Sequence, residues 1–187
     1  MPTPEDNTTD NFLAYFNTQD TNNLMNKVFC PDNAPLGIPS VGLTDEGPQF
    51  VGAAEVQGLF QQLFVSFPDI TLTQLYERLY SKVGPTRIAF QARIRARQDQ
   101  PWFQKGDPHF SPPISDIVPD KVHLTHLPAC VILTFDANSL VTNWTIYFDR
   151  YRMAQQLTPG FPSSTSLANS LASLARSLAS LGGGRGP

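Results

Sequence analysis

Apolar residues recur at helical spacing twice near the start of the chain. The first stripe follows Asp10, which can cap a helix N-terminus, and it comprises Phe12, Leu13 and Phe16. The second stripe follows Asp20 or Thr21 and ends before Pro31, which cannot continue a helix; it comprises Leu24, Met25, Val28 and Phe29. These patterns predict two short helices, preceded by a flexible polar tail over residues 1–9.

A third and longer stripe begins at Gly52 and ends where Phe67-Pro68-Asp69 interrupts the helical spacing. Its apolar positions are Ala54, Val56, Leu59, Phe60, Leu63 and Phe64. A stripe of this width is typical of an amphipathic helix packed on a core. The sequence therefore predicts a third helix over residues 52–67.

Beyond residue 70 the apolar period changes to two, the period of a β-strand. Pro128 is predicted to mark a bulge or a sheet edge. The predicted strands, the first two joined by Gly84-Pro85, are 70–81, 86–97, 122–135 and 140–149. Three helices followed by a four-stranded antiparallel meander predict an α+β fold in which the sheet wraps around the helices.

Two stretches, residues 30–51 and 98–121, fit neither period and hold more than half of the 17 prolines. A long loop within a domain is either a binding or lid element or a plain connection. The pattern leaves both readings open.

A leucine repeat distinguishes the C-terminal segment from the rest of the chain. Its members, spaced by four and three residues in turn, are Leu167, Leu171, Leu174, Leu178 and Leu181. The pattern predicts a linker at 158–165, an amphipathic heptad helix at 166–181 and a flexible Gly-rich tail at 182–187. Because an isolated helix of this length is marginal in water, it needs a partner. It either packs on its own domain or joins two copies, and we expect a homodimer.

Composition narrows the class of protein. The chain has 187 residues, a formal net charge of −3, 13 Phe, 5 Tyr and 2 Trp, which is enough apolar material for the core of one domain. An acidic balance disfavours a nucleic-acid partner. Cys30 and Cys130 have no spacing typical of a zinc site or a disulfide scaffold, so we predict no metal. No apolar run is long enough to span a bilayer and no secretory signal is evident; we expect a soluble cytoplasmic protein without a membrane partner.

The familiar catalytic motifs, such as GxSxG, the phosphate loop and HExxH, are missing. Alternation along the last strand places Trp144, Ile146 and Phe148 on one face and Tyr147 and Asp149 on the other. An Asp at the end of an aromatic-rich strand can act as a general base if apolar surroundings raise its pKa. The alternative is an ion pair of Asp149 with a nearby arginine, at 150, 152 or in the 87–97 strand.

Residues 131–157 resemble the closing strands of SnoaL-like proteins of the NTF2-like superfamily. The matching features are a turn at Asp136, a strand with Trp144, Asp149 five positions later, and a final Gln156-Leu157. The block LFQQLFVSFPDI within residues 52–70 is similar to the third helix and the strand entry of that family. The resemblance covers residues 10–157 and points to the polyketide cyclase-like branch.

This resemblance implies an NTF2-like cone, with three N-terminal helices packed in a curved antiparallel sheet around an apolar pocket. It implies acid/base chemistry without a cofactor on a small hydrophobic molecule: cyclisation, isomerisation, hydration or dehydration. The residues it points to are Asp149 with His126 or His123 as catalytic groups, and Trp144, Tyr147, Phe60, Phe64 and Tyr15 as substrate-binding groups. The alternative is a non-catalytic ligand-binding or dimerisation module that uses the open sheet face, with its arginines at 87–97.

Overall fold

The computed structural model describes residues 2–32, 37–43, 49–81, 85–97 and 123–149, with the backbone alone for 123–126. Several sequence predictions lie outside these residues. They concern the 98–121 stretch, the linker at 158–165, the heptad helix at 166–181 and the tail at 182–187. The predicted homodimer, which depends on that helix, therefore stays a prediction.

The first helix, α1 (Pro4–Asn17), begins inside the segment predicted to be a flexible tail. A capping box causes the earlier start: the Asp6 backbone N–H donates to Thr3 Oγ1 at 3.2 Å, and the Thr3 N–H donates to Asp6 Oδ2 at 2.9 Å. Pro4 occupies the first helical position, where its fixed φ is favourable. The absence of apolar residues before Phe12 made this turn look like a tail.

The predicted second helix is present as α2 (Thr21–Asn23) continued by a π-helical turn, η1 (Leu24–Val28). Asp20 caps it, because its Oδ1 accepts from the Asn23 N–H at 3.0 Å. The third helix, α3 (Ala53–Ser66), confirms the prediction for 52–67. Gly52, with φ of 101°, leads into α3, whose first N–H, on Ala53, donates to Asp32 Oδ1 at 2.6 Å.

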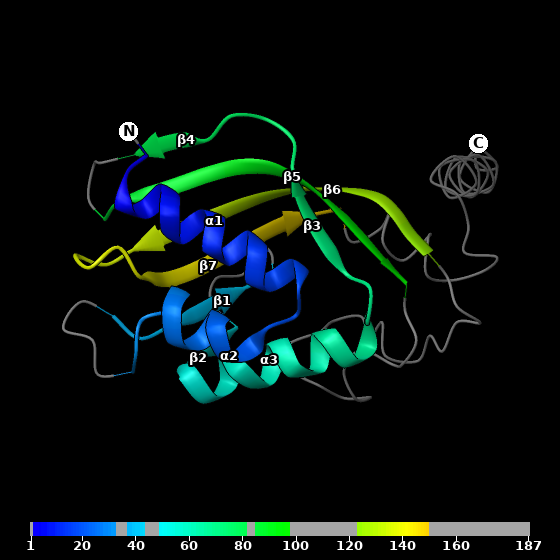
Figure 1. Ribbon diagram of the computed structural model, residues 1–187, viewed down its shortest axis with the longest axis horizontal. Coiled ribbons are helices and arrows are strands. Elements are labelled where there is room, and N and C mark those ends of the chain that lie inside the picture. Colours follow the sequence, from blue (N-terminus) through cyan, green and yellow to red (C-terminus); the bar gives the residue numbers. More distant parts are fainter. Residues whose placement is uncertain (1, 33–36, 44–48, 82–84, 98–122, 150–187) are drawn as a thin grey trace, which may run out of the picture.

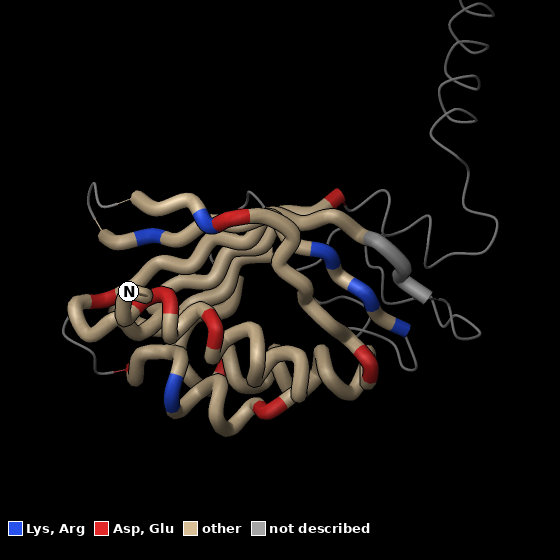
Figure 2. The backbone as a smooth tube through the Cα atoms, turned by 45° about the horizontal axis from the view of Figure 1, so that its top comes forward, with Lys and Arg blue, Asp and Glu red and all other residues tan. Residues whose placement is uncertain are grey.

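The three long strands form the predicted antiparallel meander. They are β5 (Arg87–Arg97), β6 (His123–Phe135) and β7 (Val141–Phe148), and Val131 pairs with Phe90 on one side and Ile146 on the other. Pro128 lies one residue beyond the last β6–β7 pair, Ala129 with Phe148, so its missing N–H interrupts no bond to β7. Exposed arginines alternate with buried apolar residues along β5, as its period predicts. Figure 2 shows the positions of the arginines along the backbone in blue.

The sheet is larger than the sequence predicted. Two short strands, β1 (Ser40–Gly42) and β2 (Phe50–Val51), lie in the stretch 30–51 that was read as a loop; β1 runs parallel to β7, and β2 antiparallel to β1. The predicted strand 70–81 is two strands, β3 (Thr71–Gln74) and β4 (Leu79–Ser81), which pair with different parts of β5. The order is β2-β1-β7-β6-β5-β3, with β4 beside β5.

The helices α1, α2 and α3 all lie against one face of this curved, open sheet (Figure 1). Figure 2 shows the same two layers from another side. The core between them is rich in aromatic rings, and Trp144 of β7 is in contact with Phe12, Phe16 and Phe60 from the helices. The structure thus confirms a mixed α+β fold, with an open sheet of seven strands and three helices in the described residues.

Candidate functional site

A narrow apolar cavity of about 40 Å³ lies between the concave face of the sheet and the helices. Its described lining comes from α1, α3 and the strands: Phe16, Leu43, Leu59, Leu63, Phe67, Ile70, Leu72, Ile94, Leu127, Trp144, Ile146 and Phe148. Alternation on β7 turns its three members inward, and helical spacing does the same for Leu59 and Leu63. The cavity is therefore a place where apolar ligand surface is protected from water.

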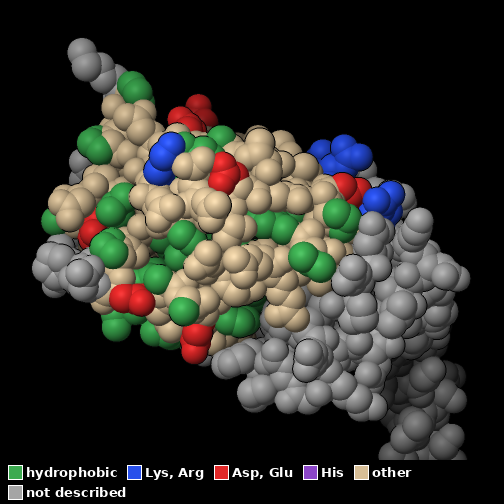
Figure 3. All heavy atoms as spheres, turned by 60° about the horizontal axis from the view of Figure 1, so that its bottom comes forward, with side chains coloured by type: hydrophobic (Ala, Val, Ile, Leu, Met, Phe, Trp, Pro, Cys, Tyr) green, Lys and Arg blue, Asp and Glu red, His purple; other side chains and the backbone are tan. Residues whose placement is uncertain are grey.

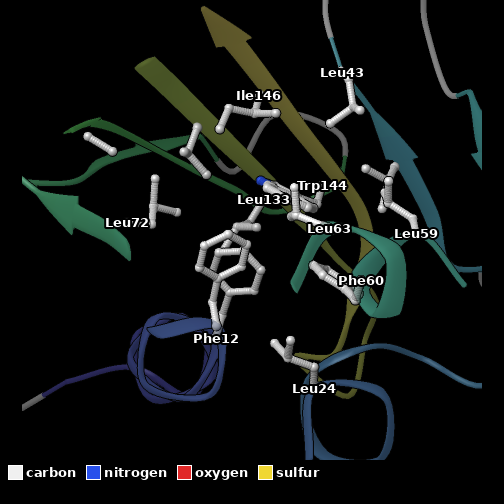
Figure 4. Packing of buried hydrophobic residues seen from close by; sticks show 14 of the residues in the cluster. Phe12, Leu24, Leu43, Leu59, Phe60, Leu63, Leu72, Leu133, Trp144 and Ile146 are labelled. Atoms are coloured by element: carbon white, nitrogen blue, oxygen red, sulfur yellow. The ribbon is translucent and has the colours of Figure 1, made fainter. Parts of the chain in front are cut away.

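Trp144 is the one described lining residue whose side chain contains a polar atom, but the cavity wall itself exposes apolar atoms only. The side chain is 2% exposed, and its Nε1–H has no hydrogen-bond partner in the part of the chain that the structure describes. In Figure 4 the indole nitrogen points toward the side where Leu72 and Ile146 lie. A buried donor without a partner costs about 1–3 kcal/mol, so this atom calls for an explanation.

Phe60 and Phe64, predicted as pocket walls, lie in the aromatic cluster and not among the residues that line the cavity. The Phe60 ring stacks on the Trp144 indole, with 5.4 Å between centroids and 8° between planes. Phe64 packs edge-on against Phe16 at 5.5 Å. The two phenylalanines thus support the wall from behind.

The positions of Tyr147 and Tyr15 differ from what the sequence-based reading expected. Tyr147 is 40% exposed and pairs with Cys130, on the face of β7 opposite Trp144. The alternation of a strand excludes two successive side chains from one face. Tyr15 is half-buried on α1, with Lys27 Nζ 5.7 Å from its ring centroid, and it is not part of the described lining.

Of the candidate catalytic groups, the structure describes the side chain of Asp149 but only the backbone of His123 and His126. Asp149 is exposed and follows Phe148, whose side chain lines the cavity. His123 pairs with Arg97 through the backbone, and His126 lies where the β5–β6 register shifts. The side chains of both histidines lie outside the described residues, as do the two arginines at 150 and 152 that the sequence offered as ion-pair partners of Asp149.

Most of the cavity wall was missed as a functional site by sequence reasoning. Leu59, Leu63 and Leu72 carry the same periodic signal as any core position. A core residue and a cavity-lining residue are both apolar and both face inward, so the pattern does not separate them. The one available signal was Trp144, since a buried Trp brings a donor that needs a partner.

A second group of polar side chains, the Arg78 cluster, consists of Asp6, Asp10, Arg78 and Tyr80. Arg78 donates to Asp6 Oδ1 at 3.1 Å and also to Asp10, while Tyr80 Oη donates to Asp6 Oδ1 at 2.6 Å. The hydrogen bond from Tyr80, followed by that from the Thr3 N–H, holds the pKa of Asp6 well below its usual range, with Arg78 adding to the effect against the opposing influence of burial. These bonds tie α1 to the segment around β4.

Neither the Cys30 thiol nor a metal site adds chemistry among the described residues. Burial, followed by the nearby charge of Asp136, raises the pKa of the Cys30 thiol to about 11, which keeps it protonated. Among the described residues, His, Cys, Asp and Glu side chains nowhere gather in threes as a metal site requires. On the face seen in Figure 3, charged side chains are scattered among apolar and polar ones. Within the described ranges, no helix has the length and apolar character needed to cross a membrane.

Solved structures share this architecture at low sequence identity. A candidate SnoaL-like polyketide cyclase from Jannaschia sp. CCS1 aligns with a TM-score of 0.59 and 14% identity, over 84% of this chain and 95% of that chain. AclR, a candidate hydroxylase from Streptomyces galilaeus, aligns with a TM-score of 0.59 and 15% identity over 99% of this chain and 100% of its own. For TsrD from Streptomyces laurentii the TM-score is 0.57 at 14% identity, over 82% of this chain and 94% of that one.

No family model matches the sequence, and no curated protein does either. At such identities the likeness to solved structures concerns the fold alone. The architecture agrees with the resemblance noted in the sequence: the chain has the α+β fold of SnoaL-like, NTF2-like proteins.

Proposed function

We propose that the cavity binds a small hydrophobic molecule and that Asp149 performs acid/base chemistry on it without a cofactor. The observation that carries the proposal is the apolar lining of a cavity held between the sheet and helices of a SnoaL-like fold. Apolar ligand surface moved from water into such a site gains about 25 cal/mol per Å².

The size of the cavity limits what enters it. Its volume of about 40 Å³ exceeds the roughly 10–15 Å³ that one water needs, but it is far below the ~300 Å³ or more of a site that encloses a whole drug-sized ligand. The cavity therefore accommodates the narrow end of a molecule whose remainder extends beyond it. Phe148 lines the cavity and is the last residue of β7, so Asp149 lies just beyond the end of the strand. The proposal requires its carboxylate to reach the bound molecule from that position.

The proposed chemistry is a proton transfer. A carboxylate oxygen of Asp149 takes a proton from a carbon next to a carbonyl of the substrate, and the C–H electron pair moves into the resulting enolate. The carboxylic acid then returns the proton, so the protein ends as it began. His123 or His126 is the proposed second acid/base group, serving the substrate oxygen.

The alternative is a ligand-binding protein without catalysis. It is favoured by one observation: no described residue of the cavity wall carries a titratable group, and Asp149 is exposed. The two functions share the cavity and differ in whether Asp149 reaches the bound molecule.

Proton exchange separates them. The probe is 1-indanone, whose C2 protons exchange slowly with D₂O in the absence of a base, and ¹H NMR follows their loss. We expect the protein to accelerate the exchange and Asp149→Asn to reduce that acceleration by about 10²-fold or more while retaining binding. Glu77→Gln, which removes an exposed carboxylate elsewhere, serves as the matched control and keeps the rate.

Two results would count against catalysis by Asp149. If Asp149→Asn exchanges as fast as the wild type, another group is the base. If 1-indanone binds but its exchange is not accelerated by either protein, the chain is the binding module of the alternative.

A further inference from the structure

The face of the sheet that is turned away from the helices carries apolar side chains, and no described helix covers it (Figure 1). Residues directly opposite each other on antiparallel strands point to the same face, so the pairing of β4 to β7 arranges the outward side chains in two rows. The rows are Leu79, Ala89, Ile132 and Thr145, and beside them Gln91, Cys130 and Tyr147.

An open hollow of about 680 Å³ lies over these rows, on the side of β4. Its described lining includes Tyr76, Glu77, Leu79, Ala89, Gln91 and Cys130. Exposed apolar residues are usually scattered singly, but here Tyr76, 66% exposed, and Leu79, 73% exposed, lie together. Tyr147, 40% exposed, continues the surface on the far side of Cys130. Grouped exposure of this kind marks a docking surface.

The last described residue, Asp149, lies close to this hollow. It is two positions beyond Tyr147, which pairs directly with Cys130 of the lining. Paired residues on neighbouring strands are about 5 Å apart, and each residue along a strand adds about 3.3 Å. The sixteen residues 150–165, which connect Asp149 to the leucine repeat, span up to about 50 Å when extended. The repeat is therefore tethered within easy reach of the hollow.

The leucine repeat has the pattern that an apolar sheet face requires of a partner. With 3.6 residues per turn, its five leucines fall on one face of a helix, and Asn169 and Arg176 fall on the opposite face. Arg176 is the one charged residue within 166–181, so the leucine face brings no charge to the hollow. A helix over 166–181 is about 24 Å long, and four neighbouring strands are about 14 Å across. The helix is thus long enough to cross β4, β5, β6 and β7.

We propose that residues 166–181 form a helix whose leucine face docks on the outer face of the same chain's sheet, in the hollow between Tyr76, Leu79 and Cys130. The leucine repeat alone allowed two partners, its own domain or a second copy. The tether favours its own domain, because a short linker holds the helix near the hollow at an effective concentration in the millimolar range. The inference therefore differs from the homodimer expected from the repeat, and it does not depend on the cavity or its proposed chemistry.

Disulfide formation with Cys130 tests the docking in the full chain. Cysteines are placed one at a time on the leucine face, as Leu171→Cys, Leu174→Cys and Leu178→Cys. The matched controls on the opposite face are Asn169→Cys and Arg176→Cys. Cys30 does not compete, because it is buried and its raised pKa keeps it protonated. With oxidised glutathione as oxidant, we expect at least one leucine-face cysteine to bond to Cys130 within one chain at least tenfold faster than either control.

Non-reducing electrophoresis and peptide mapping identify the product. Equal rates for the two faces would show that the helix does not dock in the hollow. A covalent dimer in place of the intrachain bond would show that the helix occupies a second copy. Either result would overturn the proposal.

A second measurement needs no added cysteine and decides the matter if those variants do not fold. Iodoacetamide alkylates Cys130 slowly while the helix covers it. Leu79→Glu places a charge in the hollow at a position that is 73% exposed, so it should release the helix and raise the alkylation rate about tenfold. Val65→Glu adds the same charge at a 57% exposed position on α3 and should keep the rate. An unchanged rate in Leu79→Glu would contradict the docking.

Discussion

The Arg78 cluster and the cavity beside Trp144 differ in how their polar atoms are satisfied. In the cluster, the Arg78 side chain is 11% exposed and uses its nitrogens on Gln74, Asp6 and Asp10. At the cavity, Trp144 is more deeply buried, at 2% exposed, yet its Nε1–H has no described partner. The polar groups of the Arg78 cluster are satisfied within the fold, whereas the Trp144 donor beside the cavity has no described partner.

This difference is informative because buried polar groups in proteins are nearly always paired. A cluster whose members bond one another stabilises the fold, and it carries no evidence of a ligand. An unpaired donor costs stability, so each one calls for an explanation. If charge alone were the criterion, Asp6 and Arg78 would be taken for a functional site. If unsatisfied hydrogen bonds are the criterion, Trp144 is the residue that stands out.

The largest expected effect concerns the rings that fix the indole. Phe60 is fully buried and stacks on Trp144, so Phe60→Ala should lower the free energy of unfolding by about 3–5 kcal/mol. Val65→Ala, on the same helix but 57% exposed, should change it by about 0.5 kcal/mol or less. Urea unfolding measures both. A loss below about 1 kcal/mol for Phe60→Ala would show that the ring cluster does not hold the indole in place.

A smaller effect with a distinct pH dependence is expected in the Arg78 cluster. The pKa of Asp6 is lowered in the folded protein from its ordinary value of 3.8, so the folded state binds a proton less readily than the unfolded state. The stabilisation is therefore present above about pH 5 and is lost as the pH falls through the lowered pKa. Asp6→Asn should lower the free energy of unfolding by about 1 kcal/mol at pH 7, since the side chain lies near the surface.

The control for this variant is Glu5→Gln, which removes a charge from the same first turn of α1 but leaves the partners of Arg78 in place. Unfolding measured from pH 7 down to pH 2 should show the wild type and Asp6→Asn converging at low pH. A difference that stays constant over this range would mean that the charge of Asp6 does not contribute to stability.

The same contrast explains which parts of the molecule were predictable. The helix α3 and the strands β5, β6 and β7 are long enough for their period to be read, and the inward position of Trp144 follows from the parity of β7. The strand β1 spans three residues and pairs with β7 about a hundred residues away, so no local pattern announces it.

Candidate site residues were harder to predict than helices and strands. A site is recognised by the contacts of its side chains, including a missing hydrogen-bond partner, and these are visible only in the packed structure. Trp144 and Ile132 are both apolar strand residues in the sequence. Only the packed structure shows that the Trp144 donor has no hydrogen-bond partner among the described residues. Tyr147 was assigned to the pocket although the alternation of its own strand places it opposite Trp144. In that case the resemblance to a family outweighed a simpler physical rule.

The smallest expected effect tests the alternation of side chains along β7, by comparing the neighbouring residues Ile146 and Tyr147. Ile146→Val removes one methylene from the cavity wall, which should weaken binding of 1-indanone by about 0.8 kcal/mol, or roughly fourfold. Tyr147→Ser removes a larger side chain from the opposite face and should change the affinity less than about twofold, within ordinary experimental error. Titration followed through the indole ¹H–¹⁵N cross-peak of Trp144 measures both. If Tyr147→Ser weakens binding and Ile146→Val does not, the ligand binds on the outer face of the sheet, and the cavity beside Trp144 is only a packing defect of the core.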